Sequence, residues 1–331
     1  MRVFLAGLLL AVTTLSSAIA QEWARHDFPY QSHYVEVMGS NMHYVDTGGD
    51  GSVVVMIHGQ PSWSYLWRNI IPHLEDNHRV IALDLIGFGK SDQPDIEYLA
   101  SQHAEYLQGF MDALELDDIT LVIHDWGSIL GFDFAARNPE RVKAIAFMEA
   151  AVITGPREAP YEAPLPINGE ASERNLEGFG RVLEQIRTPG VGQELILEQN
   201  FVLEQLMLPA FAGLLSEDEM NAYREPFTEG RNRRPMLQFP RDVPFGTEGP
   251  SYTQEMMERY NTYLRTREDL PKLLLHLSEG LLIDRWDVEW MRRNFSDLTI
   301  HDMGPGGHFM QEYNPRGIGR ALAIWMRANE L

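Results

Sequence analysis

Residues 121–131 read LVIHDWGSILG, and the rest of the chain is organised around this stretch. The apolar run at 121–123 is typical of a buried strand. The run stops at His124 and Asp125, and apolar side chains recur at helical spacing after Gly127. The stretch therefore predicts a strand, a sharp turn and a helix, with Asp125 at the apex of the turn.

The residue at the apex limits the chemistry that the turn can perform. An aspartate with an ordinary pKa of about 3.9 is ionised at neutral pH, so it needs no base to become a nucleophile. It does need a carbon that a carboxylate can attack, namely a saturated carbon with a good leaving group. An aspartate at the start of a helix could instead be an N-cap. The other motifs of the chain decide between these interpretations.

The first twenty residues have the pattern of a secretory signal peptide. Arg2 precedes an apolar run over residues 3–12, and the AIA sequence at residues 18–20 fits a cleavage site. We therefore expect the protein to be exported, either to a periplasm or out of the cell. The alternative is an uncleaved membrane anchor, but the apolar run is shorter than the ~20 residues that span a bilayer.

The composition limits the partners of the protein. The 331 residues are 44% hydrophobic and carry a formal net charge of −21. Removing residues 1–20 removes one arginine and no acid, so the mature charge is 26 minus 48, or −22. Such a surface repels phosphate and anionic lipid, so we expect no nucleic acid partner and no membrane association after cleavage. The chain has no cysteine, so no disulfide can stabilise it after export.

Strand and helix patterns alternate along most of the chain, which predicts a doubly wound, mostly parallel α/β sheet that opens with an antiparallel hairpin. Between residues 155 and 249 only short helical patterns occur, including 195–208 and 217–224. We expect a helical cap here, inserted after the sixth strand and over the carboxyl ends of the strands, where ligands bind in such sheets. A separate helical domain is the alternative.

The expected division of the chain is a signal peptide (1–20), a first part of the core (21–154), the cap (155–249) and a second part of the core (250–331). The expected strands are 34–38, 42–46, 53–57, 80–84, 119–123, 144–148, 272–276 and 299–303. The expected helices outside the cap are 66–74, 100–116, 287–294 and 318–327.

Three side chains at strand ends could act together. Asp125 is the candidate nucleophile, Glu149 follows the next strand, and His308 lies in the glycine-rich GPGGHF turn after the last strand. Nucleophile, acid and histidine occur in this order in hydrolases with an α/β-hydrolase fold. There the histidine activates water and the acid fixes its tautomer.

Six motifs together resemble the haloalkane dehalogenases, a family with this fold. They are HGQPSWSYLWRNIIPHL from residue 58, DLIGFGKSD from 84, VIHDWGS from 122, RNPERVKAIAFME from 137, AYREPF from 222 and GPGGHFMQEYNP from 304. The resemblance implies hydrolysis of a carbon–halogen bond to alcohol, halide and proton, without cofactor or metal. The expected partners are a small apolar halogenated substrate, water and the halide ion, and we expect a monomer.

The resemblance also implies roles for residues at matching positions. Asp125 is then the nucleophile, His308 the base and Glu149 its acid partner. Trp126 matches the tryptophan whose indole donates a hydrogen bond to the halide, with the side chain of Gln60 as the second halide donor. The backbone amides of Gln60 and Trp126 match the oxyanion hole.

Two positions depart from the family pattern. Most members have asparagine where this chain has Gln60, and the extra methylene displaces the amide by up to about 1.5 Å. A displacement near 1 Å can cost ~100-fold in rate. Glu279 stands at the end of the strand at 272–276, where another branch of the family keeps its acid. We favour Glu149, because FME matches the better populated branch.

Two other functions remain open from the sequence. An epoxide hydrolase shares the aspartate turn but needs acidic hydroxyls, for which Tyr161, Tyr223 and Tyr252 are the candidates. The second alternative is an exported protein that binds a ligand and has no catalytic activity. Apolar cap side chains that could line a tunnel for a neutral substrate are Phe201, Leu206, Met207, Leu208, Phe211, Leu214, Phe239 and Pro240.

Overall fold

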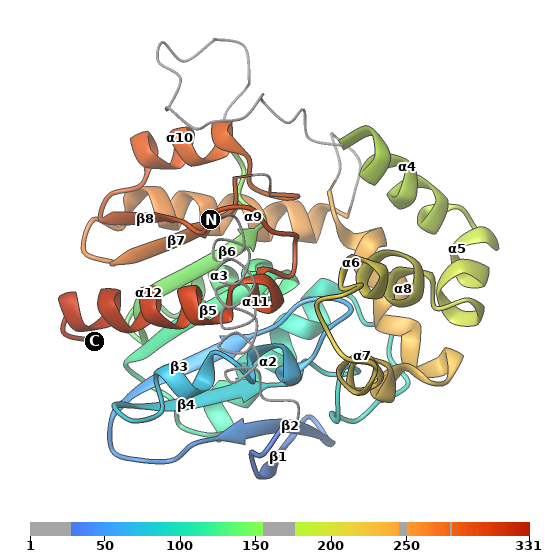
Figure 1. Cartoon of the computed structure of the whole chain (residues 1–331), viewed down its shortest axis with the longest axis horizontal. Coiled ribbons are helices and arrows are strands. Elements are labelled where there is room, and N and C mark those ends of the chain that lie inside the picture. Colours follow the sequence, from blue (N-terminus) through green and yellow to red (C-terminus); the bar gives the residue numbers. More distant parts are fainter. Residues whose placement is uncertain (1–27, 155–175, 245–249, 279) are drawn as a thin grey trace, which may run out of the picture.

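The computed structural model of the chain describes residues 28–154, 176–244, 250–278 and 280–331 (Figure 1). The expected signal peptide, Tyr161 and Glu279 lie outside the described residues. Among the helices that the structure describes, none is long and apolar enough to cross a membrane.

In the described residues, eight strands form one sheet in the order β1-β2-β4-β3-β5-β6-β7-β8. The β1–β2 and β2–β4 pairs are antiparallel, and all other pairs are parallel. The expected mostly parallel sheet with its hairpin is therefore confirmed. The strands are β1 (Ser32–Val37), β2 (Ser40–Asp46), β3 (Ser52–Ile57), β4 (His78–Leu83), β5 (Ile119–Asp125), β6 (Val142–Ala150), β7 (Lys272–His276) and β8 (Leu298–Asp302).

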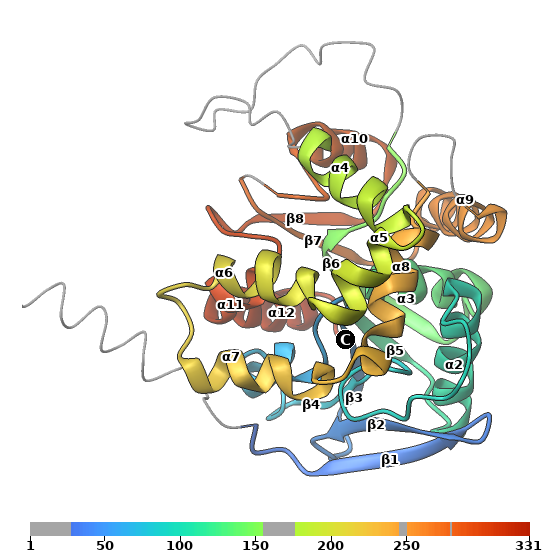
Figure 2. The same cartoon turned by 90° about the vertical axis from the view of Figure 1, so that its right-hand side faces the viewer.

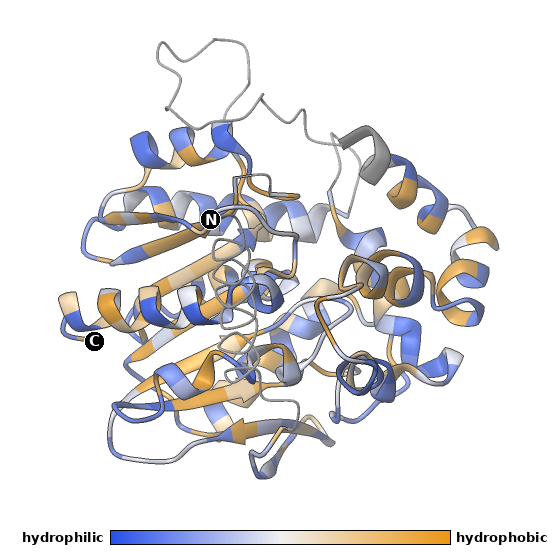
Figure 3. Cartoon of the chain, in the orientation of Figure 1, coloured by the Kyte–Doolittle hydropathy of each residue, from blue (hydrophilic) through white to orange (hydrophobic). Residues whose placement is uncertain are grey.

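Alternate side chains of the central strands enter two apolar cores, one on each face of the sheet. Val55 and Ile57 of β3 belong to the first core, and Val54 and Met56 belong to the second. Because both faces are buried, these strands are apolar without interruption, as the orange central strands of Figure 3 show. Helices α2 (Ala100–Ala113), α3 (Trp126–Arg137), α9 (Ser251–Thr266) and α10 (Arg285–Asn294) contribute to the first core, and η2 (Ile71–His73) and α12 (Pro315–Ala328) contribute to the second. The short η1 (Ser64–Trp67) contributes to both.

Within the range expected for the cap, the described residues 176–244 form a series of helices, most of them short. In Figure 1 the cap helices lie on the right, beside the carboxyl ends of β4 and β6, and Figure 2 shows them from that side. They are α4 (Leu176–Arg187), α5 (Val191–Gln193), η3 (Glu194–Glu198), η4 (Val202–Met207), α6 (Leu208–Ala210), α7 (Glu217–Arg224), η5 (Glu225–Phe227), η6 (Gly230–Arg233) and α8 (Arg234–Asp242).

Two expected helices were wrong in form. In place of one helix at 66–74, the chain forms two short 3₁₀ helices, η1 and η2. Pro72 in η2 has no backbone N–H, so it cannot continue a helix that begins at η1. The expected helix at 195–208 is divided into the π-helical segments η3 and η4. The division falls at Asn200, whose positive φ of 53° is incompatible with a continuous right-handed helix.

A buried ion-pair network joins the cap to the core. Arg68, in the turn after η1, is fully buried and binds Glu312 through both terminal nitrogens, at 2.5 and 2.9 Å. It also binds Glu219 of α7 at 2.9 Å. The hydroxyl of Tyr223, also on α7, donates to Glu312. Breaking one partner of such a network leaves a buried charge uncompensated, so the network holds α7 in place.

Candidate active site

The turn at Asp125 has the strained geometry of a nucleophile elbow. Asp125 ends β5 with φ 51° and ψ −126°, and α3 begins at the next residue. The hydroxyl of Ser128 donates to the Asp125 carbonyl at 2.5 Å and accepts from the amide of Ala151 at 3.0 Å, which fixes the turn between β5 and β6. A methyl group on Gly127 would lie 2.3 Å from the carbonyl oxygen of Ile57, so the approach of α3 to β3 requires glycine.

The carboxylate of Asp125 is held by groups on both sides. Its Oδ1 accepts a hydrogen bond from the backbone amide of Gln60 at 2.8 Å. Its Oδ2 lies 3.4 Å from Nε2 of His308. Burial would raise the pKa of Asp125, but hydrogen bonds and charge from His308, together with His124 and the backbone amide of Trp126, lower it below its ordinary value. Asp125 is therefore ionised at neutral pH.

The imidazole of His308 connects Asp125 to Glu149. Its Nδ1 lies 2.9 Å from Oε2 of Glu149, which is almost fully buried. The same carboxylate oxygen accepts from the backbone amides of Leu281 and Leu282, at 2.8 and 3.1 Å. Burial would lower the pKa of His308, but hydrogen bonds and charge from Asp125 and Glu149 raise it to about 9. In the free protein, the imidazole is thus a cation between two carboxylates.

His124, for which the sequence pattern predicts no role, fixes the loop that carries His308. This fully buried residue precedes Asp125 on β5, and its Nε2 bonds to the backbone carbonyl of His308 at 2.9 Å. Burial, with the charge of His308, lowers the pKa of His124 to about 4. His124 is therefore neutral, and its Nε2–H donates. Its place at a strand end beside Asp125 is the signal that could have identified it.

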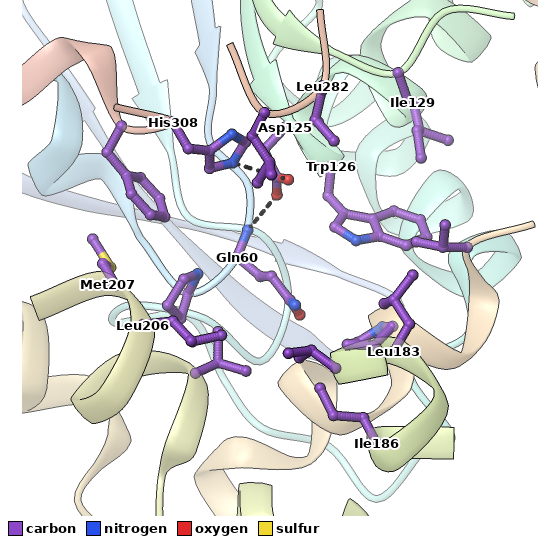
Figure 4. Close-up of a pocket in the computed structure, with 18 of the residues that line it drawn as sticks. Gln60, Asp125, Trp126, Ile129, Leu183, Ile186, Leu206, Met207, Leu282 and His308 are labelled. Carbon is purple, nitrogen blue, oxygen red and sulfur yellow. Dashed lines mark hydrogen bonds and ion pairs between the residues drawn. The ribbon is translucent and has the colours of Figure 1, made fainter. Parts of the chain in front are cut away.

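The reactive groups face a cavity of about 250 Å³ between core and cap. The site residues Gln60, Asp125, Trp126 and His308 all line it, and their side chains converge on the same space in Figure 4. Apart from Gln60, Asp125, His308 and Tyr313, the lining side chains are apolar. Such a site suits a neutral apolar guest.

The indole of Trp126 is fixed by stacking. The centroid of its ring lies 4.2 Å from the ring centroid of Phe239, and the interplanar angle is 9°. In Figure 4, the side chains of Trp126 and Gln60 both enter the cavity, and the backbone nitrogen of Gln60 lies beside the carboxylate of Asp125. Oε1 of Gln60 is buried without a hydrogen-bond partner. The donors that these two side chains offer to an anion in the cavity are the indole N–H of Trp126 and the amide N–H of Gln60.

The cap supplies much of the apolar wall, but only some of the cap side chains expected there line the cavity. Leu206, Met207, Phe211 and Pro240 line the cavity, whereas Phe201, Leu208, Leu214 and Phe239 do not. Helix α4, which the sequence did not predict to reach the cavity, provides Val182, Leu183 and Ile186. These side chains have the helical spacing of any amphipathic helix, so their spacing did not mark them as lining a cavity.

Of the candidate tyrosines of an epoxide hydrolase, the structure describes Tyr223 and Tyr252. Tyr223 donates to Glu312, and neither it nor Tyr252 lines the cavity. Tyr313 does line it, but its hydroxyl hydrogen is engaged with the carbonyl of Ala210 at 2.7 Å. Across the described residues, no cluster of three or more histidine, aspartate or glutamate side chains could hold a metal ion.

Comparisons with known proteins identify relatives over most of the chain. The family model described as alpha/beta hydrolase fold matches residues 52–315. A haloalkane dehalogenase of Mesorhizobium japonicum is 36% identical over 292 residues, covering 88% of this chain and 90% of that protein. A haloalkane dehalogenase of Sphingobium indicum is 38% identical over 306 residues, covering 90% of this chain and 95% of that protein. The chain belongs to the haloalkane dehalogenase family.

Solved structures of haloalkane dehalogenases have the same fold as this chain. The dehalogenase DatA from Agrobacterium tumefaciens C58 gives a TM-score of 0.80 at 32% identity, covering 92% of this chain and 98% of that chain. The dehalogenase DbeA from Bradyrhizobium elkani USDA94 gives 0.81 at 34% identity, covering 91% and 98%. The family inferred from the six motifs is therefore confirmed.

Proposed function

We propose that this protein hydrolyses carbon–halogen bonds of small apolar haloalkanes to alcohol, halide and proton, through an alkyl ester on Asp125. One observation carries the proposal. An ionised carboxylate faces a largely apolar cavity, with the His308–Glu149 pair behind it, and Trp126 and Gln60 line the same cavity. Family membership supports the same reaction.

In the first step, Oδ2 of Asp125 attacks the halogen-bearing carbon. The carbon–halogen bond breaks with its electron pair on the halogen, and an ester forms. Halide leaves without a proton, so it needs only hydrogen-bond donors in a site that excludes water. We assign this role to the indole N–H of Trp126 and the side-chain amide of Gln60. Oδ1 stays on the amide of Gln60 and becomes the ester carbonyl oxygen.

In the second step, His308 takes a proton from water, which attacks the ester carbon of Asp125. A pKa of about 9 would leave His308 protonated at neutral pH and unable to act as a base. Alkylation removes the negative charge of Asp125, which is one cause of that raised pKa. His308 can therefore lose its proton once the ester has formed. The oxyanion then forms on Oδ1, where the backbone amides of Gln60 and Trp126 stabilise it.

We also propose that residues 1–20 direct export and that the mature protein is a monomer. The support is the sequence pattern at the N-terminus and the highly acidic charge, which disfavours self-association. N-terminal sequencing of the expressed protein and light scattering test these two points.

The test of the function is a side-by-side assay with 1-bromobutane and 1,2-epoxybutane. We expect acid and bromide in equal amounts from the first substrate and no diol from the second. A pH indicator follows the acid, ion chromatography the bromide, and gas chromatography the diol. Diol formation without bromide release would instead assign epoxide hydrolysis. No turnover of either substrate would support a silent binding protein.

A further inference from the structure

A tyrosine hydroxyl of the core bonds the cap beside the cavity. Tyr313 ends α11 (Met310–Tyr313), the short helix that follows His308. Its hydroxyl donates to the backbone carbonyl of Ala210, the last residue of α6, at 2.7 Å. Tyr313 and Ala210 both line the cavity, and α6 lies beside α11 in Figures 1 and 2. This bond therefore closes the cavity wall where core and cap meet.

The cap segment held by this bond forms much of the wall. It runs from the π-helical η4 into the three-residue α6 and provides Leu206, Met207, Ala210 and Phe211. Leu206 is 44% exposed and still lines the cavity, so the cavity meets solvent near it. Ala210 follows Leu206 by about one helical turn, which places it on the same side of the segment. The Tyr313–Ala210 bond thus lies close to the mouth of the cavity.

The ring of Tyr313 also fills the space between this segment and the loop of His308. A methyl group on Gly307 would lie 2.9 Å from the Tyr313 hydroxyl oxygen, so the hydroxyl sits directly against the residue before His308. On the cap side, the ring centroid lies 6.4 Å from that of Phe211. The side chain is half-buried, as expected for a group that borders an opening.

We propose that Tyr313 is a specificity-determining residue that sets the width of the opening by tying α6 to the loop of His308. Slim linear haloalkanes enter with the bond intact. Branched or cyclic haloalkanes need the η4–α6 segment to move outward, which breaks the bond. The inference rests on the proposed function for its substrate class, but the Tyr313–Ala210 hydrogen bond can be tested without catalysis.

The experiment compares Tyr313→Phe and Tyr313→Ala with the wild type on 1-bromobutane and bromocyclohexane. The phenylalanine variant keeps the ring and loses the bond, and Tyr34→Phe is the matched control, because Tyr34 is 54% exposed on β1. We expect the ratio of kcat/KM for bromocyclohexane to that for 1-bromobutane to rise two- to tenfold in Tyr313→Phe, the loss expected for one neutral hydrogen bond. In Tyr313→Ala it should rise more than tenfold, and in Tyr34→Phe it should not change.

Hydrogen exchange of the backbone amides of residues 206–208, 210 and 211 tests the Tyr313–Ala210 bond directly. The exchange should be several-fold faster in Tyr313→Phe than in the wild type or Tyr34→Phe. An unchanged substrate ratio in active Tyr313 variants would overturn the proposal, as would unchanged exchange. If the wild type releases no bromide from either substrate, the proposed function fails, and exchange alone decides whether the tie exists. Tyr313→Phe keeps the test valid if the alanine variant does not fold.

Discussion

The protonation of His308 should change during the reaction, and this change can be timed. In the free protein its Nε2 lies 3.4 Å from Oδ2 of Asp125, and a pKa of about 9 keeps it protonated at pH 8. Alkylation turns Asp125 into a neutral ester. Two unit charges at this distance interact by about 5 kcal/mol at an effective dielectric constant of ~20, an upper bound of roughly three to four pKa units. The pKa of His308 should therefore fall toward its ordinary range, and the proton should leave at pH 8.

The expected result is that bromide and proton appear together in a single turnover, before the alcohol. Stopped-flow absorbance of a pH indicator in weak buffer follows the proton. Quenched samples give bromide by ion chromatography and alcohol by gas chromatography. His308→Phe is the matched control, because it should release one bromide and no proton. A proton that follows the alcohol rather than the bromide would refute the reasoning, as would a proton burst from His308→Phe.

Three further predictions concern the same site. Trp126→Phe keeps an aromatic ring on Phe239 but removes the N–H, and kcat for 1-bromobutane should fall ~100-fold in a bromide-release assay, the usual loss for a donor to developing charge. Glu149→Gln should give a bromide burst and then a slow phase, whereas Glu279→Gln should behave as the wild type; the reverse pattern would assign the acid to Glu279. Because folding raises the pKa of His308 from its ordinary 6.5 to about 9, the resulting stability is complete below about pH 6.5 and is lost as the pH rises through 9. This contribution to the free energy of unfolding amounts to about 3 kcal/mol. The free energy of unfolding measured in urea should therefore fall between about pH 6.5 and 9 in the wild type and stay nearly level in His308→Phe.

The sheet could be predicted from the sequence because its strands carry their own signal. Residues of β3 and β5 are apolar on both faces, and the turn at Asp125 separates this pattern from the helical spacing of α3. The positions of the candidate catalytic side chains could also be predicted, since Asp125 and Glu149 lie at the ends of β5 and β6 and His308 follows β8, and parallel strands end at the same edge.

The cap was harder to predict because its shape depends on tertiary contacts. Asn200 interrupts an apolar pattern that is otherwise helical, and nothing in the local spacing shows that its φ is positive. The contributions of Leu281 and Leu282 to Glu149 come from backbone amides, which have no sequence signature. The contact between Tyr313 and Ala210 joins residues 103 positions apart, so only the folded chain reveals it.

The central claim is that the carboxylate of Asp125 attacks the carbon of the substrate and forms an ester with it. The most direct test incubates His308→Phe with 1-bromobutane and measures the intact mass of the protein and of its peptides. We predict a mass increase of one butyl group, located on Asp125, together with one equivalent of bromide. A protein that releases bromide without gaining this mass, or that carries the butyl group on another residue, would contradict the claim.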